Sequence, residues 1–593
     1  MRNEIRTQRN GCRSARRLAR VWQLWTLSFA CLGCSGSCHR VDMAGLTDSA
    51  AAQPKSSAGP TKAGPAGRTR SKAPRVPLGV NLGSLSYYSP TLPFLDVMKN
   101  ADSPQTTKAS FGGPWNTELV DKVPFDAAGW PLEIPYSGPG VTEPQRVRYS
   151  VVSLTYPGRY TLLYDGDGEF EFPAAPVKVL DQAPGTIYLD VQHRDEGSVF
   201  LTITRSAKAN HVRNVRLILP GYDKTYATQV FHPRFLEQIK GASVLRFMDW
   251  QRTNNSELAH WKDRATPQMS QATWRGASIE TMIDLANRVD ADPWLCVPHL
   301  ADDDFVEQMA KVVKERLAPG RVVYIEYSNE IWNGIFGQYK YAAEQGCKVG
   351  LNKLGSYAGS CDDDGAKMWA GTKYTAKRAA KIFDTFERVF GGTDRIVRVL
   401  AGQAAFVDRN EVLLKAFADP AINPKRVKAD ALAIAPYFGG VANDLAEKQG
   451  ASSLTVETIL QHMDSSIQEQ VRDLTRQNKA VADKYGMRLV AYEGGQHLVA
   501  NGELMNDESL TQKLIAANRH PRMSQLYEKM FDAWYSASGR DLLVLFNSAE
   551  MPSKYGSWGL LENQEQLPER APKYRAFRDQ LIKLSLTNKP PAQ

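Results

Sequence analysis

From residue 242 onward, the sequence alternates apolar runs of strand length with helix-like segments in a regular order. Examples of the apolar runs are PWLCVPHL at 293–300, DALAIAPYF at 430–438 and DLLVLFNSAE at 541–550. Together with LGVNLG near the start, the eight runs span residues 78–83, 242–250, 293–300, 321–330, 395–403, 430–438, 488–497 and 541–550. Continuous apolar runs are typical of strands that are buried on both faces of a parallel sheet. The pattern predicts an α/β fold, a (β/α)8 TIM barrel, with a doubly wound open sheet as the alternative.

The segments between these runs have the periodicity of amphipathic helices. In residues 302–320, apolar side chains recur at helical spacing, acidic residues occupy the first turn, and Pro319-Gly320 ends the segment. Further helices are expected at 278–290, 366–390, 454–485 and 511–538. Each should cover one face of the parallel sheet.

One region interrupts the alternation. Residues 125–222 contain short alternating runs such as RVRYSVVSLTY and SVFLTITRS, separated by Gly, Pro and Asp, which is typical of an all-β structure. We interpret this region as a sandwich-like β domain inserted between barrel strands 1 and 2, and the alternative is an elaborated loop without its own core. The first barrel strand and a helix would then occupy 77–124, and the rest of the barrel 223–593.

The N-terminal segment has a different composition from the rest of the chain. Residues 1–75 carry 14 Lys and Arg against 3 Asp and Glu, whereas the remainder carries 59 against 61, so the folded part is nearly neutral. The charge therefore gives no support to nucleic-acid binding. Residues 1–40, in which arginines precede a short apolar run, predict a signal peptide, and residues 41–76 predict a solvated, disordered tether.

Three cysteines close to that apolar run, Cys31, Cys34 and Cys38, leave two interpretations open. The cluster is similar to a bacterial lipoprotein processing site, which would give a lipid anchor, and the alternative is an ordinary cleaved signal. In either case, we expect a bacterial protein that is secreted or anchored in the cell envelope.

Polar residues replace apolar packing at the ends of two predicted barrel strands. Asn329 and Glu330 end the fourth strand in YIEYSNEIWN, and Glu493 ends the seventh in RLVAYEGGQH. In a (β/α)8 barrel, reactive side chains lie at these carboxyl ends of the strands. Two facing carboxyl groups, one protonated and one ionised, are what the retaining cleavage of a glycosidic bond requires. Glu326 lies about 13 Å deeper along the fourth strand, where a buried ion pair is the more natural role.

This combination of residues resembles the clan-A (β/α)8 retaining glycoside hydrolases, and the wording YIEYSNEIWN is similar to a little-characterised bacterial branch of that clan. The resemblance covers the barrel and not the inserted β region. It implies that Glu330 is the general acid/base, that Glu493 is the nucleophile, and that Asn329 hydrogen-bonds the sugar 2-hydroxyl. Arg246 in LRFMDW is the plausible strand-two arginine that keeps the nucleophile ionised, and an ion pair with Asp249 or Glu326 is the alternative.

Four further residues are candidates for contact with a sugar. Trp332 follows Glu330 closely, and Trp558 follows the eighth strand, so both could stack on sugar rings. His299 ends the third strand, where it could contact the substrate or make a structural hydrogen bond. Tyr437 on the sixth strand could donate to the nucleophile or only pack.

The remaining reactive residue types are few. Cys347 and Cys361 lie 14 residues apart in a Gly-rich loop and could form a disulfide in an oxidising envelope. The aspartate runs 302–304 and 362–364 fit helix capping better than calcium binding, and no metal site is expected.

Two functions follow from these residues. We expect a retaining glycoside hydrolase that cleaves β-linked polysaccharide or oligosaccharide and needs no cofactor. The alternative is a non-catalytic carbohydrate-binding surface protein on the same barrel. A metal-dependent hydrolase or deacetylase would need ligand clusters that the sequence lacks. Sugar identity and oligomeric state are left open.

Overall fold

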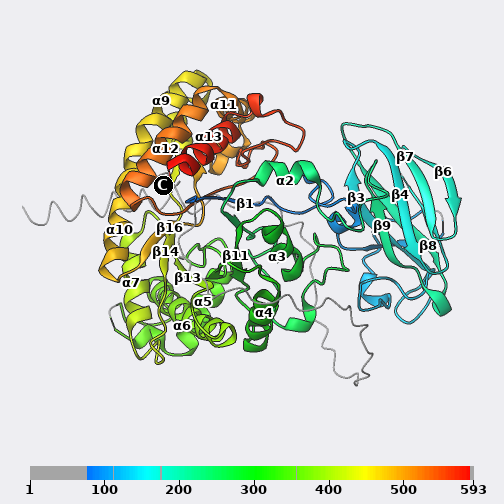
Figure 1. The fold of residues 1–593 in the computed structure, drawn as a ribbon, viewed down its shortest axis with the longest axis horizontal. Helices are drawn as coiled ribbons and strands as arrows, with labels where there is room; N and C mark the ends of the chain where they lie inside the picture. Colours follow the sequence, from blue (N-terminus) through cyan, green and yellow to red (C-terminus); the bar gives the residue numbers. More distant parts are fainter. Residues whose placement is uncertain (1–75, 111, 174–175, 356, 588–593) are drawn as a thin grey trace, which may run out of the picture.

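The structure, a computed structural model, describes residues 76–587 except 111, 174–175 and 356. The predicted signal peptide, tether and lipid anchor therefore lie outside the described residues. Figure 1 shows two units, a barrel surrounded by helices and a β-sandwich at one end of the molecule. In the part of the chain described, no helix combines the length and the apolar character needed to cross a membrane.

Eight parallel strands close into a barrel, which confirms the predicted fold class. They are β1 (Leu78–Asn81), β10 (Val244–Arg246), β11 (Asp292–Val297), β12 (Val323–Tyr327), β13 (Ile396–Ala401), β14 (Ala431–Ile434), β16 (Arg488–Ala491) and β18 (Leu543–Leu545). The last strand pairs with the first, with Leu78 opposite Leu543, so the open-sheet alternative is excluded. Almost every residue of these strands is buried, as the continuous apolar runs require.

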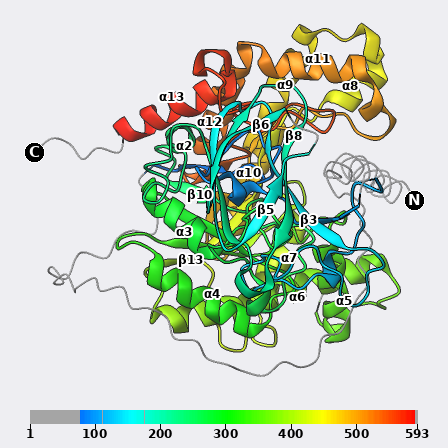
Figure 2. The ribbon, with the colours of Figure 1, turned by 90° about the vertical axis from the view of Figure 1, so that its right-hand side faces the viewer.

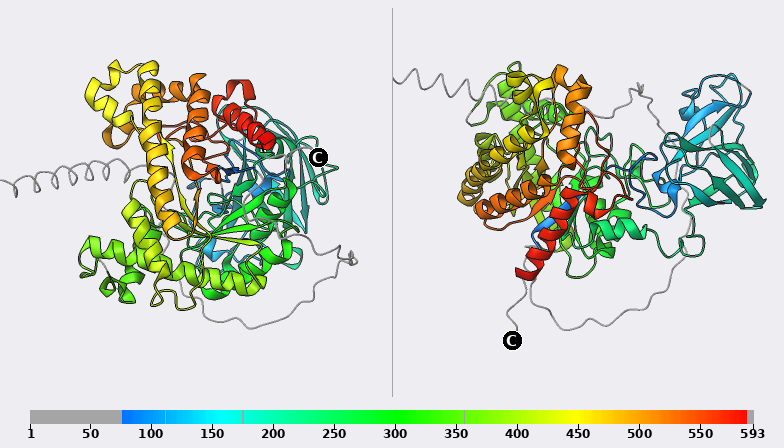
Figure 3. Two further views of the ribbon diagram at one scale, coloured as in Figure 1. Left: turned by 60° about the vertical axis from the view of Figure 1, so that its left-hand side comes forward. Right: turned by 90° about the horizontal axis from the view of Figure 1, so that it is seen from above.

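Helices surround the barrel and pack on the outer faces of the strands (Figures 1 and 3). They are α2 (Pro233–Ile239), α3 (Ile279–Arg288), α4 (Asp303–Arg316), α5 (Gly337–Lys348), α6 (Asp364–Phe390), α7 (Val407–Ala418), α8 (Ala442–Gln449), α9 (Val456–Ile467), α10 (Leu474–Lys484), α11 (Glu508–Arg519), α12 (Arg522–Ser538) and α13 (Pro572–Thr587). A π-helical segment, Gln468–Asp473, joins α9 to α10. The helix expected at 511–538 is two helices, because the chain turns at His520 and Pro521.

The two aspartate runs cap helices. Asp302 accepts a hydrogen bond from the Phe305 backbone N–H at the start of α4, and Asp363 accepts one from Ala366 at the start of α6. Among the described residues, no cluster of three or more His, Cys, Asp or Glu side chains could hold a metal ion. Between α5 and α6, Cys347 and Cys361 form a disulfide.

The inserted unit is a sandwich of two antiparallel four-stranded sheets. One sheet has the order β2-β3-β8-β5, with β2 (Gln105–Lys108), β3 (Gln145–Ser153), β8 (Ser198–Ser206) and β5 (Gly168–Glu171). The other has the order β6-β7-β4-β9, with β6 (Val177–Ala183), β7 (Thr186–Val191), β4 (Gly158–Asp165) and β9 (Arg213–Ile218). The sandwich has its own hydrophobic core, which distinguishes it from an elaborated loop. It faces the viewer in Figure 2.

The structure corrects the N-terminal boundary of this insertion. Strand β2 pairs with β3, and Leu95 and Val97 belong to the sandwich core, so the insertion begins well before residue 125. The helix expected after the first barrel strand is only a 3₁₀ turn, Val97–Asn100, and α2 follows the insertion instead. The turn forms because Asp96 accepts hydrogen bonds from Met98 in the turn and from Leu217 in β9.

The chain enters and leaves the sandwich at adjacent positions. Phe94 pairs with Phe231 and Asp96 with Ile218 in antiparallel bridges. The view from above in Figure 3 shows the sandwich set to one side of the barrel. Because the insertion follows β1, it extends from the carboxyl end of a barrel strand, where the site residues also lie.

Candidate active site

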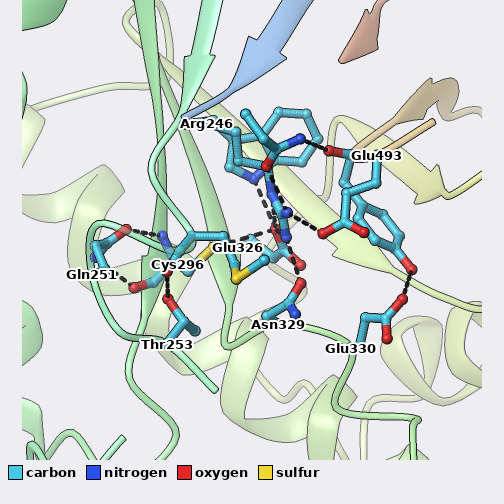
Figure 4. Close-up of polar contacts among 12 residues, drawn as sticks. Arg246, Gln251, Thr253, Cys296, Glu326, Asn329, Glu330 and Glu493 are labelled. Atoms are coloured by element: carbon cyan, nitrogen blue, oxygen red, sulfur yellow. Dashed lines mark hydrogen bonds and ion pairs between the residues drawn. The ribbon is translucent and has the colours of Figure 1, made fainter. Parts of the chain in front are cut away.

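Arg246, at the end of β10, is the centre of a buried polar network at the carboxyl end of the barrel (Figure 4). Its guanidinium group donates to Glu493 Oε1 at 2.9 Å, to Asn329 Oδ1 at 2.8 Å and to Asn81 Oδ1 at 3.1 Å. It also donates two hydrogen bonds to Glu326 Oε2, at 2.9 and 3.2 Å. The side chain is fully buried, so its position is fixed by these partners.

Glu326 has the structural role expected from its depth in the barrel. Besides Arg246, its Oε2 accepts from the Trp294 indole N–H at 2.8 Å, and the buried thiol of Cys296 lies 3.6 Å away. The sequence left two partners open for Arg246, the nucleophile or a structural acid. In the structure it pairs with both, since it contacts Glu493 and Glu326 at once. Asp249 makes no ion pair with it in the structure.

Glu493 follows β16 and is held from two sides. Arg246 bonds its Oε1, and the Tyr437 hydroxyl donates to its Oε2 at 3.0 Å. Only 1% of its surface is exposed. Burial raises the pKa of this carboxyl, while the charge of Arg246 and the two hydrogen bonds act in the opposite direction. The net result is a pKa above the ordinary value, which Arg246 and Tyr437 hold below the level that burial alone would set.

Glu330 follows β12 on a strained turn. Its φ is 39°, and Ser328 before it has a φ of 62°, both in the left-handed region that favours glycine. The Tyr492 hydroxyl donates to its Oε1 at 3.1 Å, and the Asn333 side-chain amide donates to its Oε2 at 2.9 Å. About 6% of its surface is exposed. Figure 4 shows Glu330 and Glu493 in the same polar cluster.

The two carboxyl groups titrate differently because of their surroundings. Burial, followed by the charge of Glu493, raises the pKa of Glu330 to about 8, and the donors Asn333 and Tyr492 offset this only in part. Among the described residues, no Lys, Arg or His side chain bonds Glu330, whereas Arg246 bonds Glu493. The pair therefore ionises first at Glu493, which leaves Glu330 protonated at neutral pH.

The amide of Asn329 is oriented by its neighbours. Its Oδ1 accepts from Arg246, and its Nδ2 donates to Asn254 Oδ1 at 3.0 Å. The Asn254 side chain also accepts from Gln338 Nε2 at 2.8 Å. One hydrogen of Asn329 Nδ2 thus has no partner among the described residues and can donate to a further acceptor.

The two tryptophan candidates, Trp558 and Trp332, have different neighbours. Trp558 belongs to the inner barrel cluster, 5.8 Å from the Tyr437 ring and 5.1 Å from the His497 ring. Trp332 is buried, its indole Nε1 has no hydrogen-bond partner among the described residues, and its carbonyl accepts from Arg409 at 2.7 Å. Trp558 thus lies beside Tyr437, which bonds Glu493.

His299 is buried at the end of β11. Its ring lies 5.3 Å from the Tyr341 ring, and its Nδ1 has no hydrogen-bond partner among the described residues. Burial lowers the pKa of this imidazole to about 4, so the ring is neutral at physiological pH. A neutral ring with an open nitrogen can donate to or accept from a hydroxyl group.

Sequence reasoning missed four residues of the network. Tyr492 and Asn333 bond Glu330, Asn254 bonds Asn329, and Asn81 bonds Arg246. Asn81 ends the first strand, so the rule of polar residues at strand ends could have found it. Tyr492 is adjacent to Glu493 in sequence but reaches across to Glu330, which no local pattern indicates.

The comparisons with known proteins come from solved structures. No protein-family model matches the chain, and no curated protein matches its sequence. An arabinose-bound GH51 α-L-arabinofuranosidase is 12% identical, with 81% of this chain and 75% of that chain covered and a TM-score of 0.39. A xylanase from Cellvibrio japonicus in complex with xylopentaose is 10% identical, with 82% and 99% covered and a TM-score of 0.31.

A third similar structure is a family 5 xyloglucanase from Paenibacillus pabuli, 9% identical, with 60% of this chain and 93% of that chain covered and a TM-score of 0.33. These solved structures are glycoside hydrolases. Because all three TM-scores are below 0.5, the fold is assigned from the closed eight-stranded barrel itself and the chemistry from the side chains described above.

Proposed function

We propose that the protein is a retaining glycoside hydrolase that cleaves β-linked polysaccharide or oligosaccharide by double displacement. One observation supports this above all: two buried carboxyl groups, which follow barrel strands β12 and β16, belong to one network, and in the described part of the chain only Glu493 has a cation bonded to it. An ionised nucleophile beside a protonated acid is the arrangement that retaining hydrolysis requires.

In the first step, the Glu493 carboxylate attacks the anomeric carbon while Glu330 gives its proton to the leaving glycosidic oxygen. A covalent glycosyl-enzyme forms and the aglycone leaves as an alcohol. In the second step, Glu330, now ionised, takes a proton from water, whose oxygen displaces Glu493 from the anomeric carbon. The sugar leaves with its original configuration, and both acids return to their starting states.

Residues around the pair have supporting roles in this proposal. Arg246 and Tyr437 would keep Glu493 ionised and oriented, and the remaining hydrogen of Asn329 Nδ2 would bond a sugar hydroxyl. Trp558, His299 and Trp332 would border the sugar. The groups named supply both proton transfer and nucleophile, so the proposed reaction requires no cofactor.

The test is hydrolysis of a panel of aryl β-glycosides and β-linked polysaccharides, with the anomeric form of the first product followed by NMR. Turnover that first releases the β anomer supports the proposal. Release of the α anomer would contradict double displacement, and binding of polysaccharide without any turnover would favour a non-catalytic carbohydrate-binding protein.

The pH dependence of activity follows from the ionisation order of the pair. Glu330 must carry a proton for the first step, so kcat/KM is expected to fall as the pH rises through its pKa of about 8. Glu493 must be ionised, so activity is also lost at low pH, where its carboxylate is protonated. The measurement is kcat/KM for an aryl β-glycoside from about pH 4 to about pH 10.

Tyr492→Phe provides the matched variant for this pH profile. The tyrosine hydroxyl stabilises the ionised form of Glu330, so its removal should raise the pKa of Glu330 and move the alkaline limb to higher pH. The acid limb, which reports Glu493, should stay closer to its original position. An alkaline limb that does not move would mean that another group controls it.

Export is proposed along with this activity. The disulfide between Cys347 and Cys361 supports a location in an oxidising compartment, since such bonds persist in secreted and envelope proteins. The mass of the protein isolated from the cell that makes it is the test: a chain that keeps its whole N-terminal segment and stays in the cytoplasm would contradict export.

A further inference from the structure

A large cavity lies between the sandwich and the barrel, apart from the carboxyl pair. Its volume is about 1180 Å³, above the usual size of a site for a small ligand. One wall comes from the start of the insertion and from residues 214–230, and the opposite wall from residues 262–275, which follow β10. None of the carboxyl network lines this cavity.

Aromatic rings stand on both walls. Trp274, on the barrel side, exposes 42% of its surface, and the Arg275 guanidinium lies 4.4 Å from the centre of its ring. Tyr226, on the sandwich side, accepts a hydrogen bond from Arg216 at 3.3 Å. An exposed indole is costly in water unless a ligand covers it, and aromatic rings that line a cavity suit the apolar faces of sugar rings.

The polar groups of the cavity suit hydroxyl groups without net charge. Asp96 uses Oδ1 for two backbone N–H groups, and its Oδ2 has no hydrogen-bond partner among the described residues. Five acidic and four basic side chains line the cavity, so their charges nearly cancel. This balance favours a neutral ligand rich in hydroxyl groups over a phosphorylated or acidic one.

The cavity is held in shape by contacts between its walls. Lys99, beside the sandwich, donates from Nζ to the Pro267 carbonyl at 2.6 Å and to the Gln268 carbonyl at 3.3 Å. The Gln271 backbone N–H donates in turn to the Lys99 carbonyl at 2.8 Å. A ligand therefore meets a preformed site and does not have to order both walls on binding.

The barrel-side wall is also connected with the carboxyl network. The chain between β10 and α3 carries Asn254, which bonds Asn329, and about twenty residues later Trp274. Both the insertion and this loop follow the carboxyl ends of barrel strands, so the cavity and the carboxyl pair lie toward the same end of the barrel. One long chain could contact both.

We propose that this cavity is a second glycan-binding site, which takes a neutral β-linked oligosaccharide segment of the polysaccharide that the barrel cleaves. The choice of a glycan as ligand rests in part on the proposed function. The site would raise the local concentration of a long substrate at the carboxyl pair, while substrates of one sugar would not use it.

The test compares Trp274→Ala with Trp115→Ala. Trp115 is an equally exposed tryptophan of the inserted unit, at 46%, and does not line the cavity. Affinities for xylo-, cello-, manno- and galacto-hexasaccharides are measured by calorimetry with full-length protein carrying Glu493→Gln, so that no ligand is consumed. Loss of Trp274 should weaken binding of the preferred hexasaccharide about tenfold, and loss of Trp115 should not change it.

Kinetics with catalytically intact protein give the second readout. Trp274→Ala should raise KM for the polysaccharide and leave kcat/KM for an aryl monoglycoside unchanged. Equal hexasaccharide affinity with and without Trp274, an equal loss in Trp115→Ala, or no hexasaccharide binding at all would overturn the proposal. If Trp274-dependent binding occurs but wild type cleaves nothing, the second site stands and the proposed hydrolase activity fails.

Discussion

Replacing Glu493 by alanine is expected to lower kcat for an aryl β-glycoside by at least about 10⁴-fold. The variant has no carboxylate to attack the anomeric carbon, and Arg246 and Tyr437 lose the acceptor they hold. The space left by the side chain can admit a small anion. Added azide should then react directly at the anomeric carbon and give a glycosyl azide of inverted, α configuration.

The control for this variant is Glu503→Ala, which removes an exposed carboxyl group from the turn after β16 and should keep wild-type kcat. Circular dichroism of both variants shows whether the barrel is intact, because removal of one partner of a buried ion pair also destabilises the fold. A folded Glu493→Ala variant with near wild-type kcat would refute the nucleophile assignment.

Replacing Glu330 by alanine should have an effect that depends on the leaving group. Substrates with a poor leaving group need the proton of Glu330, so kcat/KM for them should fall by about 10²-fold to 10⁴-fold. An activated aryl group leaves without a proton, so its release should stay fast while the second step becomes slow. Rapid mixing with such a substrate should show a burst of phenol equal to the enzyme concentration.

Azide separates this variant from the previous one. With Glu330 absent and Glu493 present, azide should capture the glycosyl-enzyme and give a product of retained, β configuration. Glu344→Ala, an exposed position on α5, is the matched control. An equal loss with good and poor leaving groups would mean that Glu330 does not act as the proton donor.

The barrel could be predicted because each strand is buried on both faces. Runs such as VVYI and LLVLF cannot be stable at an exposed edge, so eight of them in alternation with helices leave few possible folds. The boundary of the insertion could not be predicted in the same way. Residues 93–101 have helical character, but Leu95 and Val97 pack in the sandwich core and Asp96 bonds Leu217, far along the chain, and these long-range contacts make the segment part of the sandwich.

Part of the candidate site could be predicted, because polar residues at the ends of buried strands stand out in the sequence. Arg246 and Glu493 are found by their places at strand ends, and the structure joins them. Tyr492 and Asn333 could not be found, because which side chain reaches a carboxyl group depends on the strand register and on the strained turn at Ser328 and Glu330.

The paired entry and exit of the sandwich bear on how such a chain could arise. Phe94 pairs with Phe231, and Asp96 pairs with Ile218. The chain therefore leaves the barrel and returns to it at neighbouring positions, no farther apart than the two ends of a short hairpin. A short hairpin at this junction could be replaced by a whole β domain, or a β domain by a hairpin, and the position of β1 relative to β10 would not change. Recombination at this junction would be a way to give the same catalytic pair a new accessory surface.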